Sequence, residues 1–118
     1  MEPIFIRTRS GGKVATFPIS AFGSLEHTTR GNVYDVYVVI HTYIWPLAEC
    51  RSEEEACDLE EAILREISAS MHEYWRLGDP TIPACILDLN EIAAGNLAEI
   101  RDGDAGKMVE NSSMGADE

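Results

Sequence analysis

The residues best suited to metal binding or nucleophilic chemistry in this chain are three histidines and three cysteines. They are His27, His41, His72, Cys50, Cys57 and Cys85. No HxxxH, HExxH or CxxC motif is present, and the spacing between Cys50 and Cys57 matches no common zinc site. His72 is expected late in a helix, where a charged imidazole is favoured by the helix dipole. We therefore expect no metal site and no cofactor.

Other catalytic signatures are also missing from the sequence. There is no GxSxG elbow for a nucleophilic serine and no GxxxxGK[ST] loop for phosphate. An odd number of cysteines, without the apolar core of a secretory signal in the first ten residues, argues against a disulfide framework. We expect a protein that is not an enzyme. An enzyme that uses His41, His72 or a cysteine in a pocket stays open as a third hypothesis.

Acidic residues are concentrated in the second half of the chain. The formal net charge is -12 over 118 residues, and residues 51–118 supply all of it, because residues 1–50 carry four basic and four acidic side chains. Such a surface repels nucleic-acid phosphates and anionic lipid heads. Specific nucleic-acid binding and membrane-surface binding are therefore disfavoured, although acidity also simply aids solubility.

Short strands are expected at the beginning of the chain. Residues 4–8 and 13–17 have strand character, and Gly11 and Gly12 between them favour a tight turn. This arrangement predicts a β-hairpin. A further strand is expected over residues 20–27.

The strongest strand pattern runs from Val33 to Ile44. Alternate side chains on one face are apolar, whereas the other face mixes polar and aromatic side chains. At ~3.3 Å per residue this strand would reach ~40 Å, which is long for a chain of this size. We expect one end to extend beyond the core or to pair with another chain. The Trp45–Pro46 pair is expected to end the strand.

The best-marked element is a helix over about 53–76. Ser52 and Glu55 have the spacing of a capping box, and three glutamates occupy the first turn. Apolar residues then recur at spacings of three and four, which predicts one stripe that packs on a sheet. The stripe comprises Ala56, Leu59, Ile63, Ile67, Met71 and Tyr74. Gly78 and Pro80 are expected to end the helix.

The remaining segments complete an α+β fold. Residues 84–89 predict a returning strand, whereas residues 91–100 fit either a helix or two short arms around a turn. We expect a mixed or antiparallel β-sheet with the long helix packed on one face. The domain is expected to span residues 1–100, and residues 101–118 are expected to form an acidic flexible tail.

The order of these segments resembles a known family. The strand YDVYVVIHTY, the acidic-start helix SEEEACDLEEAILREISASM and the returning strand ACILDL follow one another between Gly31 and Leu89. This order is similar to that of the tail terminator and tail-completion proteins of long-tailed bacteriophages and phage-like particles. Members of that family often begin with a helix, whereas this chain begins with a strand, so another neck or tube-related protein is an alternative.

The resemblance implies a structural role. It implies a hexameric ring that caps the tail tube and joins it to the head connector, with DNA passing without specific binding. Its partners would be copies of itself, tail-tube proteins and head-connector proteins, and it would reside in a virion assembled in the host cytoplasm. The alternative is a small acidic α+β binding module or inhibitor acting on a basic protein. We expect the interface to include Tyr37, His41, Tyr43, Trp45, Trp75 and Met108.

Overall fold

Strands precede helices along most of the chain. The computed structural model describes the backbone over residues 4–77 and 85–116, and side chains over 4–76 and 85–103. The elements are β1 (Ile4–Ser10), β2 (Lys13–Pro18), the 3-10 helix η1 (Ile19–Ala21), β3 (Phe22–Arg30), β4 (Val33–Ile40), β5 (Tyr43–Cys50), α1 (Glu53–Leu77), β6 (Cys85–Asp88) and α2 (Leu89–Ala116). The predicted helix end at Gly78 and Pro80 lies outside the described residues.

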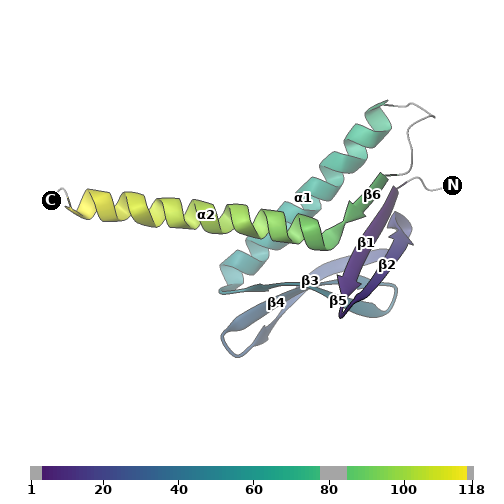
Figure 1. Ribbon diagram of the computed structural model, residues 1–118, viewed down its shortest axis with the longest axis horizontal. Coiled ribbons are helices and arrows are strands. Elements are labelled where there is room, and N and C mark those ends of the chain that lie inside the picture. Colours follow the sequence, from purple (N-terminus) through teal and green to yellow (C-terminus); the bar gives the residue numbers. More distant parts are fainter. Residues whose placement is uncertain (1–3, 78–84, 117–118) are drawn as a thin grey trace.

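The first sheet has the strand order β2-β1-β6 (Figure 1). β1 and β2 form the predicted antiparallel hairpin, and Gly11 and Gly12 in its turn have φ angles of 55° and 80°. Glycine adopts such positive angles without steric strain, so the turn signal is confirmed. β6 pairs parallel to β1, as is possible only for strands separated by a long connection. The α1 segment is part of that connection.

The second sheet is an antiparallel meander of β3, β4 and β5. The prediction of one strand from Val33 to Ile44 is wrong, because the chain reverses at His41 and Thr42 and Ile40 pairs with Tyr43. His41 has a φ angle of 58°, which is uncommon outside glycine although histidine adopts it more often than most residues, and no Asn-Gly or Asp-Gly pair marks the turn. The sequence therefore carries no ordinary hairpin signal here. The reversal also removes the overlong strand that was expected to extend beyond the core.

The Trp45–Pro46 pair lies inside β5, so the expectation that it ends a strand is wrong. The pairing between β4 and β5 shifts between Val36 and Tyr37, beside the proline. β5 is an outer strand of its sheet. An outer strand tolerates proline at such an irregularity, because no backbone N–H is needed there for a hydrogen bond to the neighbouring strand.

α1 covers the inner face of the second sheet, as predicted for the long helix. Four members of its apolar stripe are buried, and Met71 and Tyr74 pack against the core from its edge. β4 contributes the fully buried Val36, Val38 and Ile40 to the same core. Each such side chain contributes about 1.5–3 kcal/mol through burial of apolar surface. The α+β fold with a long helix packed on a sheet is thus confirmed.

Residues 91–100, for which the sequence fitted either a helix or two short arms, are helical and belong to α2. The Asp88 carboxylate caps the helix, because its Oδ1 accepts a hydrogen bond from the backbone N–H of Glu91 at 3.1 Å. Asn90 ties the start of the helix to β1, where its Oδ1 accepts bonds from the Thr8 hydroxyl at 3.1 Å and the Arg9 N–H at 2.9 Å. The division of the chain at residue 100 stays a prediction, and the backbone of α2 continues to Ala116.

Neither helix resembles a membrane span. Within the part of the chain that the structure describes, no helix combines sufficient length with sufficient apolar character to cross a bilayer.

Candidate interaction surface

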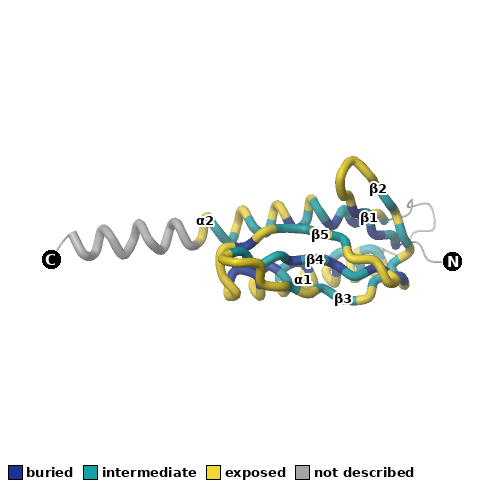
Figure 2. The backbone as a smooth tube through the Cα atoms, turned by 90° about the horizontal axis from the view of Figure 1, so that it is seen from below, coloured by how far each residue is buried: buried dark blue, intermediate teal, exposed yellow. Residues whose placement is uncertain are grey.

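The outer face of the second sheet faces away from α1. Figure 2 shows the sheet with α1 behind it and, among the described residues, no element in front of it. The side chains of Val33, Asp35, Tyr37 and Val39 alternate with the buried ones of β4, and all four stay half-buried between their neighbours on β3 and β5. The polar and aromatic face predicted from the sequence therefore exists on β4.

Tyr37 lies near the middle of this outer face. It pairs across the strands with Glu26, and its hydroxyl donates a long hydrogen bond to Glu26 Oε1 at 3.4 Å. Partial burial and the neighbouring Glu26 carboxylate raise the pKa of Tyr37, so the phenol is neutral and a hydrogen-bond donor at physiological pH. Val39 pairs with Ile44 next to it, which makes the adjoining part of the face apolar.

An ion network closes one end of this face. Arg30 Nε lies 2.9 Å from Asp35 Oδ2, and Arg30 Nη2 lies 3.0 Å from Glu49 Oε1. The network crosses all three strands, because Arg30 is on β3, Asp35 on β4 and Glu49 on β5. Charge is thus gathered at the Gly31 end, whereas the opposite end, at the β4–β5 turn, is apolar.

The β4–β5 turn exposes two large apolar side chains. Tyr43 is 68% exposed and Ile44 is 64% exposed. Beside them His41 and Trp45 both contact Phe17 of β2 edge-on, with ring centroids 5.8 Å and 6.1 Å from that of Phe17. The structure therefore gathers three of the predicted interface residues, His41, Tyr43 and Trp45, at one end of the second sheet.

The other predicted interface residues lie elsewhere. Trp75 is exposed near the end of α1 and contacts Tyr74 edge-on at 5.7 Å. Met108 lies on α2 beyond the side chains that the structure describes. Trp45 packs against the core, so only part of its ring is available to a partner.

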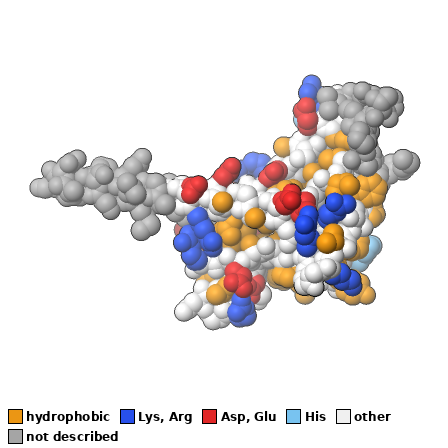
Figure 3. Space-filling model, in the orientation of Figure 1, with side chains coloured by type: hydrophobic (Ala, Val, Ile, Leu, Met, Phe, Trp, Pro, Cys, Tyr) orange, Lys and Arg blue, Asp and Glu red, His pale blue; other side chains and the backbone are white. Residues whose placement is uncertain are grey.

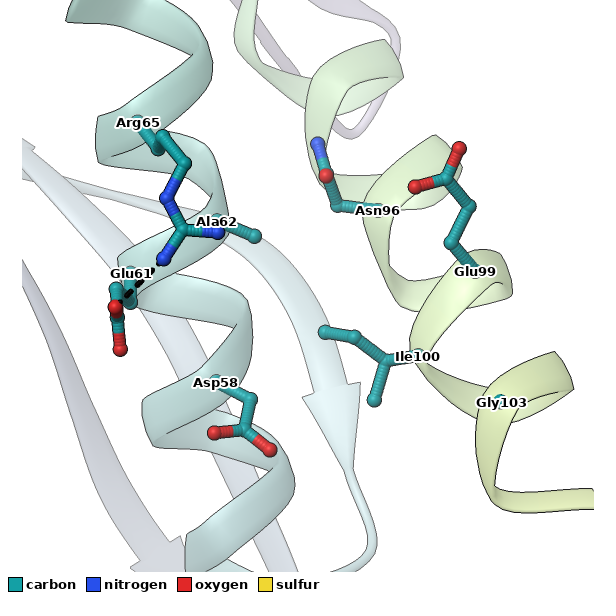
Figure 4. A pocket seen from close by; sticks show the side chains of 8 residues that line it. All are labelled: Asp58, Glu61, Ala62, Arg65, Asn96, Glu99, Ile100 and Gly103. Atoms are coloured by element: carbon teal, nitrogen blue, oxygen red, sulfur yellow. Dashed lines mark hydrogen bonds and ion pairs between the residues drawn. The ribbon is translucent and has the colours of Figure 1, made fainter. Parts of the chain in front are cut away.

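A groove of about 410 Å³ runs between α1 and α2 (Figure 4). Its lining residues are Asp58, Glu61, Ala62, Arg65, Asn96, Glu99, Ile100 and Gly103. Ile100 points toward α1 in the middle of the groove, while the charged side chains stand along its sides (Figure 4). Arg65 is paired with Glu61 at 2.7 Å. The groove can hold a basic group, and its lining contains no histidine or cysteine to support nucleophilic catalysis.

The histidines and cysteines do not meet in this groove. His41 lies in the β4–β5 turn and His72 on an exposed side of α1. Cys50 is buried at the end of β5, and burial followed by the nearby Glu55 carboxylate raises the pKa of its thiol to about 11. A neutral, buried thiol of this kind is a poor nucleophile.

Buried Glu55 holds both helices in place, a role that its spacing from Ser52 did not indicate. The Glu55 side chain is 4% exposed, and its Oε1 accepts hydrogen bonds from the Arg51 backbone N–H and from Arg101 Nη2, both at 3.0 Å. Burial alone would raise the pKa of Glu55, but the bonds from Arg101 and Arg51 outweigh it and lower the pKa to about 2. Arg101 also bonds to the carbonyl oxygen of Glu49, so α1, β5 and α2 are joined at one point.

Apolar surface is also open at the edges of the first sheet. Val14 on β2 and Ile86 on β6 are each about half exposed, and Figure 3 shows apolar side chains on the side of the molecule that carries these strands. Both strands are outer strands with one unpaired edge among the described residues.

Comparisons with protein-family models, with curated proteins and with solved structures yielded no match to this chain.

Proposed function

We propose that this chain is a non-enzymatic structural subunit of a phage-like tail or neck. It forms a homo-oligomeric ring at the end of the tail tube, joins that tube to the head connector and resides in the virion. The observation that carries the proposal is the second sheet, whose outer face has no covering element among the described residues and carries the exposed Ile44, with exposed Tyr43 beside it in the β4–β5 hairpin. Surface of this kind gains stability when a second subunit covers it.

The order of elements supports the same role. Two of the elements on which the resemblance to tail terminator proteins rests, the long α1 and then β6, follow one another in the structure, whereas the strand YDVYVVIHTY is divided between β4 and β5. Because β4 and β5 take the place of one long strand, assembly would rely on the uncovered face of the sheet and not on a projecting strand end. β3 is an outer strand that pairs only with β4 among the described residues, and a neighbouring subunit can add a strand at its other edge.

The charge distribution suits a ring through which DNA passes. Acidic side chains on α1 and along the α1–α2 groove repel the phosphate backbone and keep the duplex from adhering. The net charge of -12 acts in the same direction. DNA would therefore move through the ring without specific contacts.

Sedimentation velocity over a concentration series, with electron microscopy of the particles, tests the oligomer. We expect species larger than a monomer, alone or in the presence of purified tail tubes and connectors. Ile44→Lys should weaken assembly at least tenfold, because burial of one isoleucine contributes about 1.5–3 kcal/mol. Leu64→Lys is the matched control, since Leu64 is an exposed apolar residue on α1. A wild-type chain that stays monomeric and binds neither tubes nor connectors would refute the proposal.

The second candidate is a small acidic binding module that acts on a basic protein. The α1–α2 groove favours it, because Asp58, Glu61 and Glu99 line a concave site beside a single arginine. Capture of a basic partner with strongly salt-dependent affinity would support this function. A triple change of these acids to Asn or Gln should then abolish capture, and Ile44→Lys should leave it intact.

A further inference from the structure

His27, Cys57 and Glu60 bring three different metal-ligating atoms together. One nitrogen of His27, the Cys57 sulfur and one carboxylate oxygen of Glu60 all lie within 4.8 Å of one another. The residues come from two elements, with His27 on β3 and Cys57 and Glu60 on α1. This cluster is separate from the α1–α2 groove and from the exposed end of the second sheet.

The local structure explains why these side chains meet. His27 pairs with Val36, whose side chain is in the core, so the imidazole lies on the inner face of the sheet that α1 covers. Cys57 and Glu60 are three positions apart on α1 and therefore lie on one side of the helix. The His27 ring is also tilted toward the Tyr34 ring, with centroids 6.5 Å apart, and this neighbour restricts the orientation of the imidazole.

The two nitrogens of His27 have different surroundings. Nδ1 lies 3.1 Å from Glu60 Oε1, and Nε2 lies 4.0 Å from Glu53 Oε1. A metal bound between Nδ1 and Glu60 would leave the Nε2–H directed toward the Glu53 carboxylate. Histidines that bind metals commonly donate their second N–H to a carboxylate in this way, which fixes the tautomer.

Burial of the cluster is intermediate, as a metal site with an open position requires. The side chains of His27 and Glu60 are 22% and 18% exposed, whereas Cys57 is exposed. Two ligands of a tetrahedral zinc ion are about 3.5 Å apart, which follows from ligand distances of about 2.0–2.3 Å. His27 Nδ1 and Glu60 Oε1 are already this close, so only a longer separation, of at most 4.8 Å, has to shorten by up to about 1.3 Å, which rotation of the exposed Cys57 side chain can supply.

The donor set selects the class of ion. Imidazole, thiolate and carboxylate together suit Zn²⁺ better than Mg²⁺ or Ca²⁺, which prefer oxygen ligands alone. We propose that His27, Cys57 and Glu60 form a binding site for one Zn²⁺ ion, with water as the fourth ligand and Glu53 beside the His27 ring. The bound ion would join β3 to α1.

Titration with Zn²⁺ by calorimetry, and with Co²⁺ by absorption spectroscopy, tests this site on the reduced full-length chain. We expect one ion per chain and a thiolate-to-cobalt charge-transfer band. Cys57→Ser should abolish the band and lower affinity at least tenfold, and His27→Gln and Glu60→Gln should lower affinity similarly. Cys85→Ser and His72→Gln are the matched controls, because neither residue belongs to the cluster, and both should bind like wild type.

Cys57→Ser is the decisive variant, because Cys57 is exposed and its replacement leaves the core untouched. Circular dichroism of each variant checks that its fold is retained. Absence of 1:1 binding by the wild-type chain would overturn the proposal. Binding that Cys57→Ser leaves unchanged would overturn it equally, since the thiolate would then not be a ligand.

Discussion

Replacement of Glu55 by glutamine should destabilise the fold and remove part of its dependence on pH. The pKa of Glu55 falls from 4.5 to about 2 on folding, because Arg101 and Arg51 bond to the buried carboxylate. A shift of this size corresponds to about 3 kcal/mol of stability. Because the folded-state pKa is the lower one, this contribution is complete above about pH 5. It is lost progressively as the pH falls toward 2.

The loss of unfolding free energy at neutral pH depends on how exposed the two arginine partners of Glu55 are. Removal of one member of a buried ion pair costs about 3–5 kcal/mol when the other member stays buried. Arg51 and Arg101 are 64% and 37% exposed at their side chains, so both keep contact with water after the change, although Arg101 Nε is buried. We therefore expect Glu55→Gln to lower the free energy of unfolding by about 2–3 kcal/mol at pH 7.

Urea denaturation followed by circular dichroism, repeated between pH 7 and pH 2, measures this effect. The difference between wild type and Glu55→Gln should be about 2–3 kcal/mol at pH 7 and should shrink toward zero near pH 2. Glu61→Gln is the control, because Glu61 and its partner Arg65 are both largely exposed, and such pairs contribute less than about 1 kcal/mol. Equal pH dependence in wild type and Glu55→Gln would refute the reasoning.

Three further changes test local features, each by urea denaturation. Ser52→Ala should cost about 1 kcal/mol, because the Ser52 Oγ accepts the Glu55 N–H at 3.1 Å and caps α1; an unchanged midpoint would contradict the capping role. His41→Val should destabilise the fold by about 1–2 kcal/mol, because a β-branched side chain fits the positive φ angle poorly and the ring contact with Phe17 is lost; an unchanged midpoint would show that the turn adapts. Gly23→Ala should cost about 1–3 kcal/mol, because the added Cβ would lie 2.9 Å from the Val39 carbonyl oxygen; a neutral result would show that the strands can separate freely.

Features encoded within a few residues could be predicted from the sequence. The stripe of α1 repeats every three or four residues, and each member is buried in the core or packs against it, so the pattern and the burial agree. The Gly11–Gly12 turn was equally readable, because two glycines between strand-like segments favour positive φ angles. The Ser52 cap needed only the spacing to Glu55, and the hydrogen bond confirms it.

The β4–β5 turn shows where local pattern fails. The apolar alternation is interrupted only at Thr42 and resumes at Ile44, so one polar residue was too weak a signal to distinguish a chain reversal from a continuous strand. His41 nevertheless takes a left-handed conformation, and its backbone N–H donates to the Ala21 carbonyl oxygen at 3.1 Å. Tertiary contact here outweighs the weak preference of histidine for other backbone angles.

The division between sequence and structure follows from the range over which each interaction acts. Composition and the -12 charge follow from the sequence directly. The long helix and the first hairpin were determined by residues close together in the chain. The pairing of Glu55 with Arg101, and of His27 with Cys57 and Glu60, joins residues far apart in sequence that have no shared spacing. Only the packing of α1 against β3 and α2 brings those groups together, because burial of apolar surface sets the positions of the elements and polar groups then pair where packing places them.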